Sequence, residues 1–176
     1  MLAHAVATAR AAKCGPVELH CAPDNRHPLF RRLARRHGIR TRAQSGGDLG
    51  ARMHRSLAGA LARTGAAVLI GADCPALRSA DIRAAFSALR AGADVVLAPA
   101  EDGGYPLIGM RRASPALFEA MPWGSATVLD ETRVRAAALG WSVAALRTVW
   151  DVDRPQDVAR LRRLKAWIRS ANLTDS

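Results

Sequence analysis

The sequence has few cysteines, lysines, aromatics and acidic residues, and these shortages exclude whole classes of protein. Its three cysteines, Cys14, Cys21 and Cys74, form no C-x-x-C pair, which excludes a disulfide scaffold or a cysteine zinc site and favours a reducing compartment. We expect Cys74 to be a small buried residue rather than a nucleophile. No apolar run approaches the roughly 20 residues that span a bilayer, and the start lacks a signal-peptide pattern. We therefore expect a cytoplasmic protein with no membrane partner.

Lysine is almost absent although the chain is strongly basic. Of 26 lysines and arginines only Lys13 and Lys165 are lysines, and 15 acidic residues leave a net charge of +11. The densest arginine cluster lies in residues 31–42. A nucleic-acid surface would combine such a cluster with exposed aromatics or a known module, but aromatics are 5% of the chain. We interpret the cluster as a solvated face that attracts anionic small molecules, not nucleic acid.

Apolar residues alternate between helical spacing and short continuous runs, which is typical of successive strand–helix units. The runs 66–71 and 94–99 have the pattern of strands buried on both faces. No linker or repeat divides the chain. We predict one α/β domain over residues 1–176, with three layers, α/β/α, and a mostly parallel central sheet. The expected strands are 17–22, 39–43, 66–71, 94–99, 105–110 and 143–149, and the expected helices are 2–13, 29–36, 127–138 and 155–170, with two more capped by Asp48 and Ser79.

Carboxylates follow three of the expected strands. Asp73 follows one, Glu101 and Asp102 follow the next, and Asp151 and Asp153 follow the last. Ligands of open α/β sheets bind beyond the carboxyl ends of the strands. Carboxylate oxygens suit Mg²⁺ or Mn²⁺ holding a diphosphate. The alternative is that each aspartate caps the helix that follows it.

Five motifs in a matching order carry a resemblance to a known family. They are Q-S-G-G-D-L-G-A-R-M (44–53), G-A-D-C-P-A-L (71–77), P-A-E-D-G-G-Y-P-L-I-G (99–109), M-P-W-G (121–124) and D-V-D-R-P-Q-D (151–157). Together they resemble the bacterial glycosyltransferase-like family called radical-SAM/selenodomain-associated transferases, which is sometimes linked to arsenosugar biosynthesis. That family is similar to nucleotide-diphospho-sugar transferases of the GT-A fold. Its more distant relatives include molybdenum-cofactor and phospholactate guanylyltransferases.

The resemblance implies a metal-dependent transferase that uses a nucleotide-diphospho-sugar, a small-molecule acceptor and Mg²⁺ or Mn²⁺. Asp73 would bind the cation that bridges the diphosphate, with Asp151 or Asp153 as the second carboxylate. Gln44 would read the nucleobase, since an amide both donates and accepts hydrogen bonds. Two alternatives stay open. One is a guanylyltransferase-like nucleotidyltransferase that uses a nucleoside triphosphate and releases pyrophosphate, and the other is a truncated, non-catalytic nucleotide-binding relic.

The remaining roles concern loops and aromatic residues. Gly46 and Gly47 would let the backbone approach the nucleotide. Asp102 is the candidate general base or hydroxyl ligand on the acceptor side. Trp123 would stack on a sugar, although packing explains a tryptophan there equally well. The other expected substrate contacts are Glu101, Gly103, Gly104 and Tyr105.

Members of that family begin with a buried strand and a loop resembling K-x-P-x-P-G-x-x-K-T-R-L, ahead of the helix that matches residues 2–13. That loop supplies amides and cations to the donor phosphates. The resemblance therefore leads us to expect that the sequence is N-terminally incomplete relative to the family, which a late start codon or a truncated relic would explain. We expect the 176-residue chain to bind its donor weakly and to aggregate or form a homodimer through an open sheet.

Overall fold

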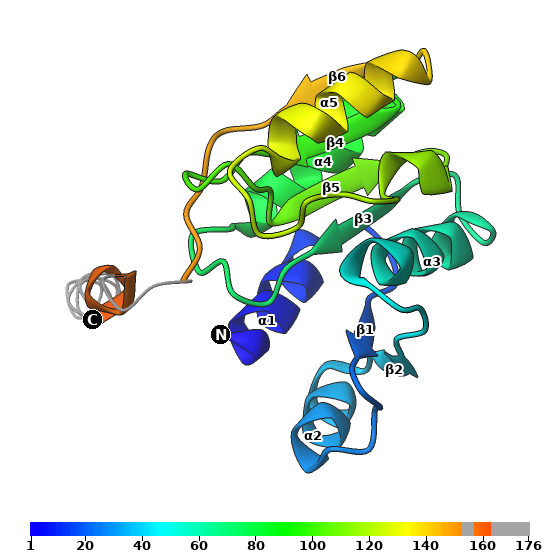
Figure 1. Ribbon diagram of the computed structural model, residues 1–176. Coiled ribbons are helices and arrows are strands. Elements are labelled where there is room, and N and C mark those ends of the chain that lie inside the picture. Colours follow the sequence, from blue (N-terminus) through cyan, green and yellow to red (C-terminus); the bar gives the residue numbers. More distant parts are fainter. Residues whose placement is uncertain (153–156, 163–176) are drawn as a thin grey trace.

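Helices cover both faces of a four-stranded sheet in the computed structural model, which describes residues 1–152 and 157–162 (Figure 1). The strand order is β3 (Ala67–Ile70), β5 (Leu107–Met110), β4 (Val95–Ala98) and β6 (Val143–Ala145). β5 is antiparallel to both of its neighbours, so β3 and β4 run in the same direction, and β6 is parallel to β4. This sheet is therefore mixed, but all its strands except β5 are parallel, as the sequence predicts.

The first two strands form a sheet of their own. β1 (Glu18–Cys21) and β2 (Arg40–Ala43) are parallel and are joined by α2 (Pro28–His37). Among the described residues β1 does not pair with β3, whereas the sequence suggested one central sheet. β3 is consequently an edge strand. The prediction that the run 66–71 is buried on both faces is wrong, because β3 is mostly half-buried.

Two groups of helices make the outer layers. On one face, α1 (Leu2–Ala12) and α4 (Ser79–Arg90) pack together against the four-stranded sheet. On the other face lie α3 (Leu49–Leu61), a 3₁₀ turn at Pro115–Leu117, and α5 (Val128–Ala138). The core residues between these layers include Ile82, Leu89, Val96 and Leu107 on the first side and Leu57, Leu97, Ile108 and Phe118 on the second. The predicted three-layer arrangement is confirmed.

The N-terminal caps of two helices can be compared with the sequence. Asp48 caps α3 as predicted, since its Oδ1 accepts a hydrogen bond from the Ala51 N–H at 2.7 Å. The prediction that Ser79 caps α4 is wrong. Ser79 is already helical, and the first turn is closed by Asp81, whose Oδ2 accepts from the Arg78 N–H at 2.7 Å. Arg78 is therefore the N-cap residue, and the carboxylate of the third helical residue binds its backbone N–H.

The C-terminal region departs from prediction in extent. β6 ends at Ala145, and only an isolated parallel bridge joins Val149 to Ala100. The spacing of Val158, Leu161, Leu164 and Ile168 predicts an inward apolar face on the helix expected over 155–170, which is described only over residues 157–162. Val158 is 38% exposed there, so the prediction that it is a core residue is wrong. Its partners Leu164 and Ile168 lie outside the described residues. Within the described part of the chain, no helix is both long and apolar enough to cross a membrane.

Candidate functional site

A cavity of about 1520 Å³ lies between β1 and the free edge of β3 and extends to the carboxyl ends of the strands. Its walls come from the two strand edges and from α1, α3 and α4. Most of the candidate site residues that the sequence singles out line this one cavity. They are Gln44, Asp73, Asp102, Gly104, Tyr105, Trp123 and Asp151.

Asp73 stands on the loop that follows β3, where its side chain is exposed. Its backbone carbonyl accepts a hydrogen bond from the Val152 N–H at 3.2 Å, which holds the segment carrying Asp151 beside it. A Cβ atom on Gly71 would lie 2.7 Å from Asp73 Oδ1, so a side chain there would disturb the carboxylate. Two strand ends that are distant in sequence thus bring two acidic residues to one cavity.

The fit of this region to a metal ion can be judged from its donors. Asp153 lies outside the described residues, and among those described no group of three or more histidines, cysteines and carboxylates is close enough to hold a metal ion. Mg²⁺ is commonly held by one or two carboxylates together with phosphate oxygens and water. Asp73 and Asp151 therefore suit a cation shared with a phosphate ligand, not one enclosed by protein alone. The metal site stays a prediction.

Gln44 is fixed to the end of β1. Its backbone N–H donates to the Cys21 carbonyl at 2.7 Å, and its Nε2 donates to the His20 carbonyl at 3.4 Å. The turn that follows does not line the cavity: Gly46 has φ of +126°, and a Cβ there would lie 3.1 Å from the backbone nitrogen of Arg52. Gly46 therefore packs on α3, and the nucleotide contacts expected of Gly46 and Gly47 stay predictions.

The loop after β4 contains residues with different roles. Asp102 is exposed, and its Oδ1 accepts from the Gly104 N–H at 2.9 Å. Gly103 has φ of +90°, and a Cβ there would collide with the Ala126 carbonyl, so the backbone itself requires glycine. Glu101 and Gly103 do not line the cavity. The sequence expected both to contact substrate, but the described contacts give them structural partners.

Arg160 is the partner of Glu101. Its guanidinium donates to both carboxylate oxygens, at 2.7 and 3.0 Å, and its Cζ lies 4.5 Å from the centroid of the Trp150 ring. These hydrogen bonds hold the pKa of Glu101 below its ordinary value. The sequence gives no sign of this pair, because 59 positions separate the two residues.

Tyr105 and Trp123 form an aromatic wall. Their ring centroids are 6.5 Å apart with an edge-to-face angle of 75°. The Tyr105 hydroxyl accepts from Thr132 Oγ1 at 3.3 Å, and burial raises the pKa of Tyr105. The buried Trp123 Nε1 has no hydrogen-bond partner among the described residues, and a Cβ on Gly50 would come within 3.1 Å of it. The two rings pack as core residues while lining the cavity.

A polar cluster that sequence reasoning missed joins β1 to α3. Ser56 Oγ lies 3.0 Å from His20 Nδ1, and His20 Nε2 lies 3.5 Å from Glu18 Oε2. Ser56 Oγ also donates to the Arg52 carbonyl at 2.8 Å. Because its proton is engaged there, the serine is not activated by the histidine as a nucleophile would be. The cluster is a polar wall of the cavity, and only folding brings its members together.

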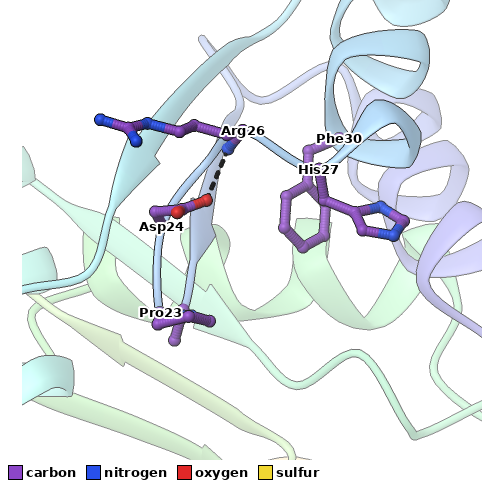
Figure 2. Close-up of a pocket in the computed structure, with 6 residues that line it drawn as sticks. Pro23, Asp24, Arg26, His27 and Phe30 are labelled. Atoms are coloured by element: carbon purple, nitrogen blue, oxygen red, sulfur yellow. Dashed lines mark hydrogen bonds between the residues drawn. The ribbon is translucent and has the colours of Figure 1, made fainter.

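A second hollow, of about 430 Å³, lies on the loop between β1 and α2 (Figure 2). Asp24 Oδ1 accepts from the Arg26 N–H at 2.8 Å, as the dashed line shows, and the His27 and Phe30 rings lie 5.5 Å apart. His27 Nδ1 also accepts from the Leu29 N–H. The side chains of Asp24 and His27 thus bind the local backbone. None of the residues predicted from the sequence lines it, and the larger cavity is the candidate site.

Comparison with known proteins gives one family and a set of similar structures. The family model described as "Uncharacterized protein conserved in bacteria (DUF2064)" matches residues 5–125. No curated protein sequence matches the chain. A solved structure from Desulfovibrio desulfuricans G20, provisionally assigned as a nucleotide-diphospho-sugar transferase, is 27% identical with a TM-score of 0.75. That match covers 87% of this chain and 69% of the other.

Two further solved structures share the fold at lower identity. CMP:2-keto-3-deoxy-manno-octonic acid synthetase, solved with CTP, is 12% identical with a TM-score of 0.61, over 94% of this chain and 88% of the other. 4-Diphosphocytidyl-2C-methyl-D-erythritol synthase is 11% identical with a TM-score of 0.60, over 93% and 87%. The similarity to the Desulfovibrio desulfuricans structure confirms the predicted fold of nucleotide-diphospho-sugar transferases, and these two structures share that fold.

Proposed function

Because this chain belongs to the bacterial DUF2064 family and has the fold of nucleotide-dependent transferases, we propose that it transfers a sugar from a nucleotide-diphospho-sugar to a small-molecule acceptor. One observation carries the proposal. Gln44, Asp73 and Asp102 come from three separate motifs, yet all line one cavity at the carboxyl ends of the strands. This is where open α/β folds bind their ligands. At a coarser level, the names of the similar structures support a nucleotide-related transferase.

The proposed reaction requires few chemical steps from the protein's own residues. An acceptor oxygen attacks the anomeric carbon, the bond from that carbon to the diphosphate breaks, and the acceptor proton goes to a base. Asp102 is exposed on a loop that lines the cavity, and its Oδ1 is oriented by the Gly104 N–H. We assign it to hold the acceptor hydroxyl and take its proton. Gln44, anchored to the end of β1, is assigned to the nucleobase.

Asp73 and Asp151 are the residues that would hold a divalent cation. When bound, Mg²⁺ or Mn²⁺ would neutralise charge on the leaving diphosphate. The exposed position of Asp73 supports this assignment, since its carboxylate forms no ion pair among the described residues.

Calorimetric titration of the chain with a panel of UDP- and GDP-linked sugars, with and without MnCl₂, tests the function. We expect at least one of them to bind in a metal-dependent way. Asp73→Asn should weaken that binding by about tenfold or more, equivalent to at least about 1.4 kcal/mol, while unfolding stays within about 0.5 kcal/mol of wild type. Asp130→Asn is the matched control, because this aspartate is 79% exposed on α5 and does not line the cavity. If wild type binds no nucleotide at all, the proposal is wrong.

A nucleotidyltransferase is the second candidate, and fold similarity to two nucleotidyl-transferring synthases favours it. The reaction joins a nucleoside triphosphate to an acceptor and releases pyrophosphate. Pyrophosphate release from each of the four triphosphates, assayed with sugar phosphates and acidic sugars as acceptors, separates the two candidates. Release of pyrophosphate supports this activity, whereas release of a nucleoside diphosphate from a nucleotide sugar supports sugar transfer.

A further inference from the structure

One arginine of the cavity differs from the others in its surroundings. Arg63 and Arg111 form ion pairs with Glu18 and Asp94. Arg52 is only partly exposed, and among the described residues no carboxylate pairs with it. The remaining cavity arginines are exposed, and they are Arg10, Arg40 and Arg90. Arg52 is thus the one that keeps a partly desolvated charge without an anionic partner in the described part of the chain.

The Arg52 side chain is anchored at one end. Its Nε donates to the Asp48 carbonyl at 3.1 Å, while its two terminal nitrogens have no hydrogen-bond partner among the described residues. The turn at Gly46 packs against the backbone nitrogen of Arg52. Arg52 therefore adjoins the segment that starts at Gln44. Withdrawing a cation from water without a partner is unfavourable. An anionic ligand in the cavity would remove that penalty.

We propose that Arg52 binds a phosphate group of the nucleotide substrate. This inference rests on the proposed function, because it names the residue that recognises the anionic part of that substrate. A guanidinium suits phosphate since its planar N–H groups form two parallel hydrogen bonds to two oxygens. Asp73 and Asp151 lie at the ends of other strands of the same cavity and carry the opposite charge. In the proposed function those carboxylates hold the cation, and Arg52 binds the phosphate directly.

The chain offers a matched control on the same helix. Arg55 lies on α3 about one helical turn after Arg52, but it is exposed and does not line the cavity. Arg55→Ala therefore removes the same charge without changing the site. Arg52→Lys keeps the positive charge but loses the planar pair of N–H groups. Arg52→Met keeps much of the aliphatic stem without the charge.

The experiment compares the phosphates of one nucleotide. The base that wild type binds best is tested as nucleoside, monophosphate and diphosphate, with Mg²⁺, by calorimetry or by ligand-observed NMR where binding is weak. We expect Arg52→Ala and Arg52→Met to weaken diphosphate binding about 10- to 100-fold and nucleoside binding less than about twofold. The diphosphate affinity of Arg52→Lys should lie between those of wild type and Arg52→Ala, and the affinity of Arg55→Ala should match wild type. Circular dichroism and melting temperature confirm that each variant folds.

The outcomes separate this inference from the function on which it rests. If wild type binds no nucleotide, both are overturned. If wild type binds but the Arg52 variants lose nucleoside and diphosphate affinity equally, the residue supports the site without touching phosphate and the inference is wrong. Unchanged diphosphate affinity in Arg52→Met, with the variant folded, also overturns it while leaving the proposed transferase intact.

Discussion

Replacing Asp94 by alanine is expected to destabilise the fold by about 3 kcal/mol. Asp94 is 7% exposed just before β4. Its Oδ2 accepts from the Ser142 N–H at 3.0 Å and the Ser142 hydroxyl at 3.1 Å, and its Oδ1 accepts from Arg112 at 2.7 Å. An orphaned buried N–H costs about 1–3 kcal/mol, and each lost charge-assisted hydrogen bond about 1.5–3. The ion pairs with the half-exposed arginines contribute little because solvent screens them. The hydrogen bonds to Ser142 therefore account for most of the expected loss.

Urea denaturation followed by circular dichroism measures this effect. A loss of about 3 kcal/mol corresponds to a fall in melting temperature of roughly 6–12 °C for a domain of this size. Asp130→Ala is the control, since that side chain is 79% exposed and, among the described residues, pairs only with Arg133 one turn away. We expect the control to change stability by at most about 0.5 kcal/mol. Equal stabilities of the two variants, with unchanged denaturant slopes, would refute the reasoning.

The same site makes stability depend on pH. The backbone N–H of Ser142, with further hydrogen bonds from Arg112, lowers the pKa of Asp94 from 3.8 to about 2, although burial opposes the shift. Between these values the unfolded chain binds more protons than the folded one. The contribution of Asp94 is therefore complete above about pH 4 and is lost as pH falls toward 2. Asp94→Asn should flatten this part of the stability curve relative to wild type.

Two further substitutions or probes test the local structure. Gly103→Ala should destabilise the fold by about 2 kcal/mol or more, because the residue has φ of +90° and a neighbouring carbonyl fills the space of a Cβ; a melting temperature equal to wild type would contradict this. Burial raises the pKa of Cys74 to about 11, and its Sγ donates to the Trp150 carbonyl. Its thiol should therefore react with a disulfide reagent at pH 8 only after unfolding, and rapid native labelling of Cys74 would count against it.

The sequence predicts the elements well because each one carries its own period of apolar residues. Asp48 and the leucines that follow it indicate α3 without any knowledge of its neighbours. The runs that became β3 and β4 are likewise local signals. The convergence of Asp73 and Asp102 on one cavity also follows from sequence, since each residue comes after a strand of the same direction.

The features that the sequence does not predict are contacts between residues that lie far apart in the chain. Asp81 closes the first turn of α4 and also binds Arg147, 66 positions away, which holds its pKa below the ordinary value although burial raises it. In a chain with so many arginines, composition cannot tell which one meets which carboxylate. The role of Arg52 cannot be predicted from the sequence for the same reason: its motif is visible there, but its partial burial and its lack of an acidic partner among the described residues are properties of the fold.

The separation of β1 from β3 has a consequence that can be measured. The Gly71 N–H donates to the Pro106 carbonyl, and hydrogen bonding alternates along an antiparallel pair, so the N–H groups of Val68 and Ile70 point away from β5 toward the cavity. Unpaired strand edges recruit other strands, which is the physical basis for expecting a homodimer through the open sheet. Amide exchange at rising protein concentration tests it: Val68 and Ile70 should exchange faster than Leu69 in dilute solution and become protected as the oligomer forms in light scattering. If dimerisation leaves these two amides unprotected, the copies pair through another surface and the free edge of β3 plays no part.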